Sequence, residues 1–307
     1  MRMSVPVSAN ANSRIASRLS KQIDRVRTHP AILLERFGRL VLYVVVIFGA
    51  IVFSLPFFWM IRTSIMPGWQ IYLIPPQWIP DELHLENWVE FWTMFPFPTF
   101  FQNTLFYVAA RTLAVTLSSS LVAYGFARLR FPGRGLLFML CLSTMMLPAQ
   151  VTLIPQYLIF SRLGWIDTYN PLVVPGLFGI AFHIFLLRQY YMSIPLEMDD
   201  SAKIDGCGFL GIYWRIILPM SLPALGVVAV MNITFAWNDF FNPLIYLNNM
   251  VRYPISLGLM LMKGEGQALD MQLLMAATTA SLMPLFALFF LAQRYFIQGI
   301  VVTGVKG

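Results

Sequence analysis

The sequence predicts an all-α membrane protein with six transmembrane helices and both termini on the cytoplasmic side. Composition is the first observation: 58% of the 307 residues are hydrophobic and 11% are charged, whereas a soluble domain carries about a quarter charged residues. The second is a series of apolar runs long enough to cross a bilayer, which takes about 20 residues. The third is the placement of Lys and Arg, most of which fall in segments that these runs would leave on one side.

Five of the expected spans contain no charged residue, and one contains a single arginine. The charge-free runs are residues 40–61, 135–161, 168–187, 216–238 and 271–293. The remaining span falls within residues 101–127 and includes Arg111. Because six spans account for most of residues 40–307, we expect one multi-pass membrane domain there and no soluble domain.

Residues 1–39 form a polar, basic segment ahead of the first span. Apolar residues at helical spacing (Ile15, Leu19, Ile23 and Val26) lie beside a basic face, which suits a helix on the anionic inner surface of the lipid bilayer. A partly disordered tail also fits this composition. The first span itself is interpreted as a retained anchor, because it is long and lacks a small-residue cleavage site.

The positive-inside rule places both termini and the polar loop 195–219 in the cytoplasm. This topology accounts for the net charge of +7, so the charge requires no nucleic-acid partner. Cys141 falls in the third span and Cys207 in the polar loop, which gives no disulfide framework and no metal site.

The polar loop, residues 195–219, separates the fourth and fifth expected spans. Residues 199–204 are compatible with a short amphipathic helix that Pro195 opens and Asp205-Gly206 closes, because glycine tolerates the left-handed conformation that ends a helix. A second helical run is expected from Phe209 to Leu218. On pattern alone, an ordinary cytosolic loop would explain these features.

The residue order in this loop resembles the EAA loop, roughly E-A-A-x(2)-D-G followed by a Pro, of membrane subunits in ATP-driven, binding-protein-dependent importers. The resemblance implies that the loop forms a coupling helix that docks on an ATP-hydrolysing subunit, with Gly206 packed closely against it. Asp200 replaces the usual Glu, Ser201 the first Ala and Cys207 the small residue after the Gly, so the ion pair of that Glu is not carried over. The residues expected to contact the ATPase subunit are Asp200, Ser201, Ala202, Asp205 and Gly206.

Further segments resemble the carbohydrate-importing branch of this family and its shorter permease subunit. Residues 237–244 match W-N-D-F-x-x-P-L, residues 127–133 match A-R-x-x-F-P-G, and the C-terminal residues 293–307 resemble the tail of that branch. The resemblance implies alternating access in the cell membrane with a second homologous permease subunit, two ATP-binding subunits and an extracytoplasmic solute-binding protein.

The chain carries no nucleotide-binding or catalytic motif of its own. It has no G-x(4)-G-K-[ST], no paired-histidine metal site and no nucleophile elbow in a strand context. We therefore expect a transport subunit that is not an enzyme and holds no cofactor, with ATP–Mg bound on the partner ATPase subunits. The rival interpretation is an ion-driven secondary transporter, since Arg111, His183 and Asp239 would be costly in lipid and such residues often couple ions.

The candidates for the translocation pathway or its gate are Arg111, Asn232, Asn238 and Asp239. Arg111 and Asp239 fall at similar depths below the outer surface, so we expect an ion pair between them. The alternative is that Arg111 extends its long side chain to the outer headgroups. Residues 248–270 are expected to reach towards the binding protein by means of their glycines, or else to form a solvated connector.

Overall fold

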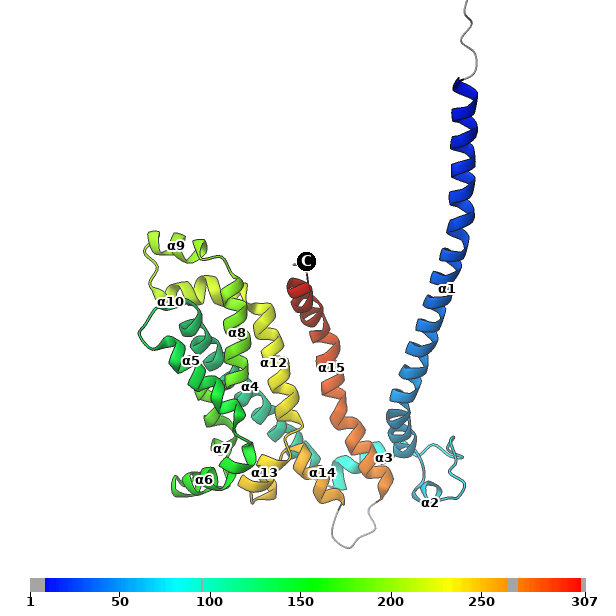
Figure 1. The fold of residues 1–307 in the computed structure, drawn as a ribbon. Coiled ribbons are helices and arrows are strands. Elements are labelled where there is room, and N and C mark those ends of the chain that lie inside the picture. The colour runs from blue at the N-terminus through cyan, green and yellow to red at the C-terminus, as the bar shows by residue number, and fades with distance from the viewer. Residues whose placement is uncertain (1–8, 95, 264–269, 305–307) are drawn as a thin grey trace, which may run out of the picture. The chain divides into compact units, whose positions relative to one another are not determined.

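The computed structural model describes residues 9–94, 96–263 and 270–304, with side chains described for residues 36–94, 96–262 and 270–293. Within these ranges every regular element is helical, which confirms the all-α class (Figure 1). The chain divides into two compact units, Met1–Trp59 and Met60–Gly307. A membrane interior has no water to hydrogen-bond backbone N–H and C=O groups. Helices, which satisfy these groups internally, are therefore the expected structure for this composition.

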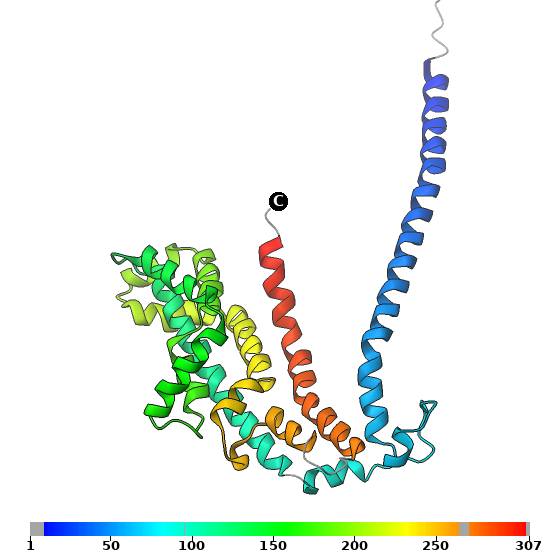
Figure 2. The same cartoon turned by 60° about the horizontal axis from the view of Figure 1, so that its bottom comes forward.

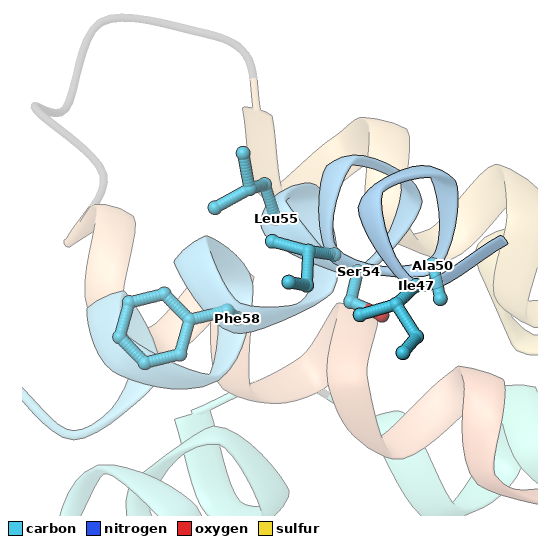
Figure 3. A pocket seen from close by; sticks show the side chains of 6 residues that line it. Ile47, Ala50, Ser54, Leu55 and Phe58 are labelled. Atoms are coloured by element: carbon cyan, nitrogen blue, oxygen red, sulfur yellow. The ribbon is translucent and has the colours of Figure 1, made fainter. Parts of the chain in front are cut away.

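The first unit consists of most of helix α1 (Ala9–Ser64). Its apolar part lies in Arg36–Ser64, with a mean hydropathy of 2.6 and no buried residue in its most apolar stretch. A shallow pocket on this helix is lined only by side chains of α1, and all but one of them are apolar (Figure 3). These side chains are Ile47, Ala50, Ile51, Ser54, Leu55 and Phe58. The pocket is therefore part of an apolar helix surface and offers a solute almost no polar contact.

Helix α4 (Phe97–Arg128) is the central helix of the second unit, and it is long and apolar enough to form the span expected within residues 101–127. It packs along α8 (Ala181–Ser193) and α12 (Leu222–Trp237). Small side chains, among them Ala114, Ser119 and Ala123, are buried on α4 and let its neighbours approach closely. Its prolines lie at the N-terminal end, where a missing N–H costs nothing.

Two of the expected spans are bent, so they are not the straight helices that their length suggests. The run 135–161 divides into α5 (Arg134–Ser143) with η1 (Thr144–Met146), and α6 (Ala149–Arg162), which meet at 99°. Leu147 is extended (φ −82°, ψ 118°), because the proline that follows it disfavours helical geometry. Among the described residues, four helices are long and apolar enough to cross a membrane, or up to six if each bent pair counts as one span.

The second bent pair follows the polar loop. The helical run Phe209–Met220 meets Leu222–Trp237 at 77°, so the expected span 216–238 contains the bend. Ser221 lies at the break, and Pro223 follows in the first turn of α12. The first arm is α10 (Phe209–Ile212), the π-helical turn η3 (Tyr213–Ile217) and α11 (Leu218–Met220).

Buried apolar side chains form two clusters at different levels of α4. One gathers Phe97, Phe100 and Tyr107 with residues of α12, α14 and α15, and the other gathers Ala123 and Tyr124 with residues of α8, η3 and α12. Figures 1 and 2 show α9 and α10 at one end of this unit and α13 and α14 at the other. The remaining elements are α2 (Gly68–Ile71), α3 (Asn87–Met94), α7 (Asn170–Val173), η2 (Val174–Phe178), α13 (Phe241–Tyr246), η4 (Met250–Arg252), α14 (Ile255–Lys263) and α15 (Met271–Gly304).

Candidate functional site

The polar loop contains the short helix that the sequence predicts. Helix α9 spans Glu197–Ile204 and ends at Gly206, whose φ of +80° is the left-handed conformation expected of the Asp-Gly stop. Of the predicted docking residues, Asp200, Ser201, Asp205 and Gly206 are exposed. Ala202 is not: it is 5% exposed and packs into the cluster around Tyr213. It lies one helical turn from the buried Asp199 on the inner face of α9, so its contact with an ATPase subunit stays a prediction, and the exposed face of α9 is formed by the other residues.

The inner face of α9 is held by an ion pair that the sequence analysis missed. Arg128, the last residue of α4, places Nε 3.6 Å from Oδ2 of Asp199, and the two side chains are 3% and 6% exposed. Arg128 Nη2 also donates to the backbone oxygen of Ile194 at 2.8 Å. Burial raises the pKa of Asp199, while Arg128 and Lys203 oppose that shift. The A-R-x-x-F-P-G segment contains Arg128, so the sequence motif pointed to the arginine but did not identify Asp199 as its partner.

Further hydrogen bonds close the end of α9 and hold the start of α10 against α4. The N–H of Cys207 donates to the backbone oxygen of Ala202 at 2.9 Å, and the hydroxyl of Tyr124 on α4 donates to the oxygen of Phe209 at 2.9 Å. The outer face of α9 is different: Lys203 bonds Asp200 at 2.8 Å in an exposed pair, and Ile204 is 87% exposed. An exposed pair contributes at most about 1 kcal/mol, so this face is free to bind something else.

The candidate gate residues do not form the predicted ion pair. Asp239 accepts a hydrogen bond from the hydroxyl of Tyr107 at 2.6 Å and bonds from the N–H and side-chain amide of Asn242. Arg111 donates instead to the backbone oxygen of Leu172 at 2.8 Å. The Arg111–Asp239 ion pair is therefore wrong. Tyr107 precedes Arg111 by one turn on the same face of α4, and its hydroxyl donates to the carboxylate of Asp239.

Two structural reasons explain where the Arg111 guanidinium goes. Its carbon lies 4.9 Å from the centre of the Phe235 ring, which suits a cation–π contact. Pro175, three residues after Leu172, has no N–H to donate to that carbonyl in the 3₁₀ turn η2, so the oxygen is available. Within the protein, Arg111 is therefore held by the Leu172 carbonyl and the Phe235 ring.

The two asparagine candidates have separate environments. Asn232 is buried, lies 3.3 Å from Nδ1 of His183 and donates to the oxygen of Val228 at 3.1 Å. Asn238 is exposed and donates to Thr234 of its own helix at 2.8 Å. His183 is therefore a buried histidine with a polar partner, while Asn238 is not brought to the cluster around Asp239. Among the residues whose side chains are described, no group of His, Cys, Asp and Glu is arranged to hold a metal ion.

Hydrogen bonds and an ion pair around Asp167, called the clasp below, join the turn after α6 to the segment after α13. Asp167 accepts bonds from the N–H groups of Asn248 and Asn249, each at 3.0 Å, and pairs with Arg252 at 2.6 Å. The hydroxyl of Tyr169 donates to the oxygen of Arg252 at 2.7 Å. Burial would raise the pKa of Asp167, but the bonds from Asn249 and Asn248 and the charge of Arg252 lower it overall. The sequence analysis missed this clasp because its residues are far apart in the chain.

At least one glycine in the segment 248–270 has a packing role and does not serve to make the segment mobile. A Cβ on Gly258 would lie 2.3 Å from the ring of Phe100, so this glycine permits close packing of α14 on α4. Met262, four residues later, is buried. Residues 264–269, with Gly264 and Gly266, lie outside the described residues.

We predict that Asp167→Asn releases the clasp. The amide keeps the size of the side chain but cannot accept two N–H bonds and pair with Arg252. Limited proteolysis should cut residues 248–253 faster than in the unsubstituted protein, whereas Asp81→Asn, at an exposed position outside the clasp, should not change the rate. Because the pKa of Asp167 is lowered, its contribution is present above the usual Asp pKa and is lost only as pH falls through the lowered value. The unsubstituted clasp should therefore resist protease equally from about pH 5 to pH 8; equal cleavage of variant and parent would contradict the assignment.

Comparison with known proteins shows the family to which this helical chain and its polar loop belong. Residues 116–302 match the family described as "Binding-protein-dependent transport system inner membrane component", and the chain belongs to that family. It is 34% identical over 259 residues to the probable ABC transporter permease protein YurM of Bacillus subtilis (strain 168), a match that covers 84% of this chain and 85% of that one. The family resemblance drawn from the EAA-like loop is confirmed, and the protein is an ABC transporter permease of the membrane.

Other similar proteins extend this result. The arabinooligosaccharides transport system permease protein AraQ of Halalkalibacterium halodurans is 33% identical over 231 residues, covering 74% of this chain and 81% of that one. The sn-glycerol-3-phosphate transport system permease protein UgpE of Yersinia enterocolitica is 29% identical over 266 residues, covering 84% and 94%. A chain from the crystal structure of a bacterial ABC transporter involved in the import of alginate has a TM-score of 0.78 at 22% identity, covering 85% of this chain and 97% of that one. At that identity the likeness shows the fold.

Proposed function

We propose that this chain is the membrane subunit of an ATP-driven importer that receives a sugar or sugar-like solute from a binding protein. Helix α9 carries the proposal: it lies within the region matched to the family, its inner face is anchored by Asp199, and its outer face exposes Asp200, Ser201 and Ile204. Ile204, 87% exposed at the end of this polar helix, is the apolar side chain of α9 that a partner surface could cover. The names of the relatives AraQ and UgpE support the class of solute.

In this proposal the chain crosses the membrane six times, with each bent pair counted as one span. Residues 1–39 form a basic cytoplasmic segment and residues 40–307 the permease domain, with both termini and α9 in the cytoplasm. The placement of Lys and Arg supports this orientation. Helix α9 is then the coupling helix, and the clasp of Asp167 and Arg252 lies on the outer side.

The proposed assembly contains a second permease subunit, two ATP-binding subunits and an extracytoplasmic solute-binding protein. ATP–Mg binds the ATPase subunits, and this chain holds no cofactor. Closure of the ATPase subunits moves α9, and the two permease subunits then alternate between outward and inward access. The absence of a phosphate-binding loop from this sequence supports a separate ATPase.

An ion-driven secondary transporter is the weaker alternative. Its best support was the charge pattern of Arg111, His183 and Asp239. In the structure, however, Arg111 bonds a backbone oxygen and Asp239 bonds Tyr107 and Asn242. A carrier of that kind also gives no role to the exposed Ile204.

We predict that Ile204→Ser weakens binding of the ATPase subunit by about tenfold or more, because full burial of an isoleucine is worth about 1.5–3 kcal/mol. Affinity of the purified permease complex for the ATPase subunit, measured by titration, gives the result directly. Leu83→Ser changes an equally apolar residue, 64% exposed, in the segment before α3, and should leave the affinity unchanged. Equal affinity of both variants and the parent would refute the docking surface.

The change Gly206→Leu, which the resemblance suggests, is a poorer test. Gly206 has φ +80°, so a leucine there strains the backbone whether or not a partner is bound. Gly208 has φ −74° and open space where a Cβ would lie. Gly208→Leu therefore adds bulk to the same loop without that strain, and loss of binding in this variant would reflect the partner.

A further inference from the structure

We infer that the buried pair Arg128–Asp199 makes α4 the element that carries a displacement of α9 to the outer side of the protein. Arg128 is thus a positioning residue for transport. The inference rests on the proposed function, because it takes α9 as the helix that the ATPase subunit moves.

The inner joint is built so that α9 and the end of α4 move together. Arg128 lies between the carboxylate of Asp199 and the backbone oxygen of Ile194, at 3.6 Å and 2.8 Å. Both charged side chains are almost fully buried, and neither Arg128 Nε nor Asp199 Oδ1 has a hydrogen-bond partner among the described residues, so the two groups meet as a charge contact. Separating the two would leave an uncompensated buried charge on each side, which is strongly unfavourable. Displacement of α9 should therefore pull Arg128 with it.

Helix α4 is the one unbroken route among the helices that meet around α9. It runs without interruption over 32 residues, which is about 48 Å at 1.5 Å per residue and exceeds the roughly 30 Å hydrocarbon core. Helix α8 starts only after Gly179, whose φ is +80°. The run that follows α9 is bent by 77° at Ser221. A push on either neighbour can be absorbed at its break, whereas α4 transmits it along its length.

The outer end of α4 is bonded to the segment that follows α13. The side-chain amide of Asn103 donates to the oxygens of Val251 and Tyr253 at 2.8 and 3.0 Å. One residue later, the hydroxyl of Thr104 accepts the N–H of Ile255 at 2.8 Å. Tyr107 adds its bond to Asp239 at 2.6 Å. The same helix thus connects α9 at one end with residues 251–255 at the other.

The test measures whether the nucleotide state of the ATPase reaches the outer end. Val251 is 65% exposed and is replaced by Cys in a chain whose Cys141 and Cys207 are changed to Ser. In the assembled importer, the rate of reaction with a membrane-impermeant maleimide is compared without nucleotide and with Mg-ATP trapped by vanadate. We expect the labelling rates with and without trapped nucleotide to differ in the parent. In Arg128→Gln, the ratio of these two rates should be close to one. Transport per ATP hydrolysed should fall by on the order of fivefold or more in the same variant.

Matched variants separate transmission from folding. Arg130→Gln removes an exposed charge two residues away and should keep the parent ratio. Asp199→Asn removes the charge from the other partner at constant size, and decides the question if Arg128→Gln does not accumulate. The exchange Arg128→Glu with Asp199→Arg should recover part of the ratio, which a purely structural lesion would not.

The outcomes distinguish the inference from the proposed function. If the parent chain assembles with the ATPase but Arg128→Gln and Asp199→Asn both keep its ratio, transmission through this pair is wrong and the proposed function stands. If the parent chain binds no ATPase subunit, the proposed function fails and the inference falls with it. If the parent chain binds the ATPase subunit but its labelling does not depend on nucleotide, the inference is wrong and the proposed function stands.

Discussion

Asp239→Asn is expected to lower the melting temperature of the permease and to stop most transport. The carboxylate acts only as an acceptor: it receives the Tyr107 hydroxyl on Oδ2 and the Asn242 N–H and amide on Oδ1. The side chain of asparagine would place its NH2 group against one of these hydrogen-bond donors. At least one of the bonds to the charged carboxylate is therefore lost. Each such bond is worth about 1.5–3 kcal/mol, and the site is buried.

The loss should be graded and local. Tyr107→Phe removes one bond and leaves Asn242 in place, so its melting temperature should fall less than that of Asp239→Asn. Asp200→Asn changes an exposed carboxylate and should leave the melting temperature of the isolated permease unchanged. Thermal unfolding of the purified variants gives the comparison; an Asp239→Asn protein that melts with the parent would show that these bonds do not hold the end of α12.

Gly258→Ala is expected to destabilise the fold by about 1–3 kcal/mol, although alanine is the better helix former by up to about 1 kcal/mol. The reason is space. A Cβ at position 258 would lie 2.3, 2.6 and 2.9 Å from three ring atoms of Phe100. Phe100 is itself buried in the cluster with Phe97 and Tyr107, so its ring cannot move aside without disturbing other side chains.

Two companion variants show whether overlap is the cause. Gly125→Ala places a methyl group in open space on α4 and should be neutral or slightly stabilising. Adding Phe100→Leu to Gly258→Ala makes room for the methyl group and should recover part of the lost stability. If Gly258→Ala unfolds at the same denaturant concentration as Gly125→Ala, α14 does not pack on α4 as closely as described.

The sequence was sufficient for the helical class, the family and the course of α4, because these depend on hydropathy and on the order of residues in a short loop. It was insufficient to predict where the chain changes direction. The run 135–161 has the length of one span, but at Pro148 the chain turns by 99°. Hydropathy records how much apolar surface a segment has and contains no information about a bend.

The candidate gate illustrates the same limit at the level of side chains. Matching Arg111 and Asp239 by depth correctly brought α4 and α12 together, since these helices do pack. Depth did not reveal that Tyr107 lies closer to the carboxylate, or that Pro175 leaves a carbonyl free for Arg111. The pair Arg128–Asp199 was missed for a related reason, because the sequence around each residue does not indicate that the two are in contact.

The central claim is that ATP, hydrolysed on a separate subunit that docks on α9, drives this permease. Uptake into proteoliposomes tests it most directly, with this chain, its partner permease, the ATPase subunits and the binding protein reconstituted together and a panel of radiolabelled sugars offered outside. Uptake of at least one sugar should require ATP on the side of α9, persist when ion gradients are collapsed, and fall with Ile204→Ser. Uptake that continues without ATP and stops when the ion gradients are collapsed would contradict the account and favour an ion-driven carrier.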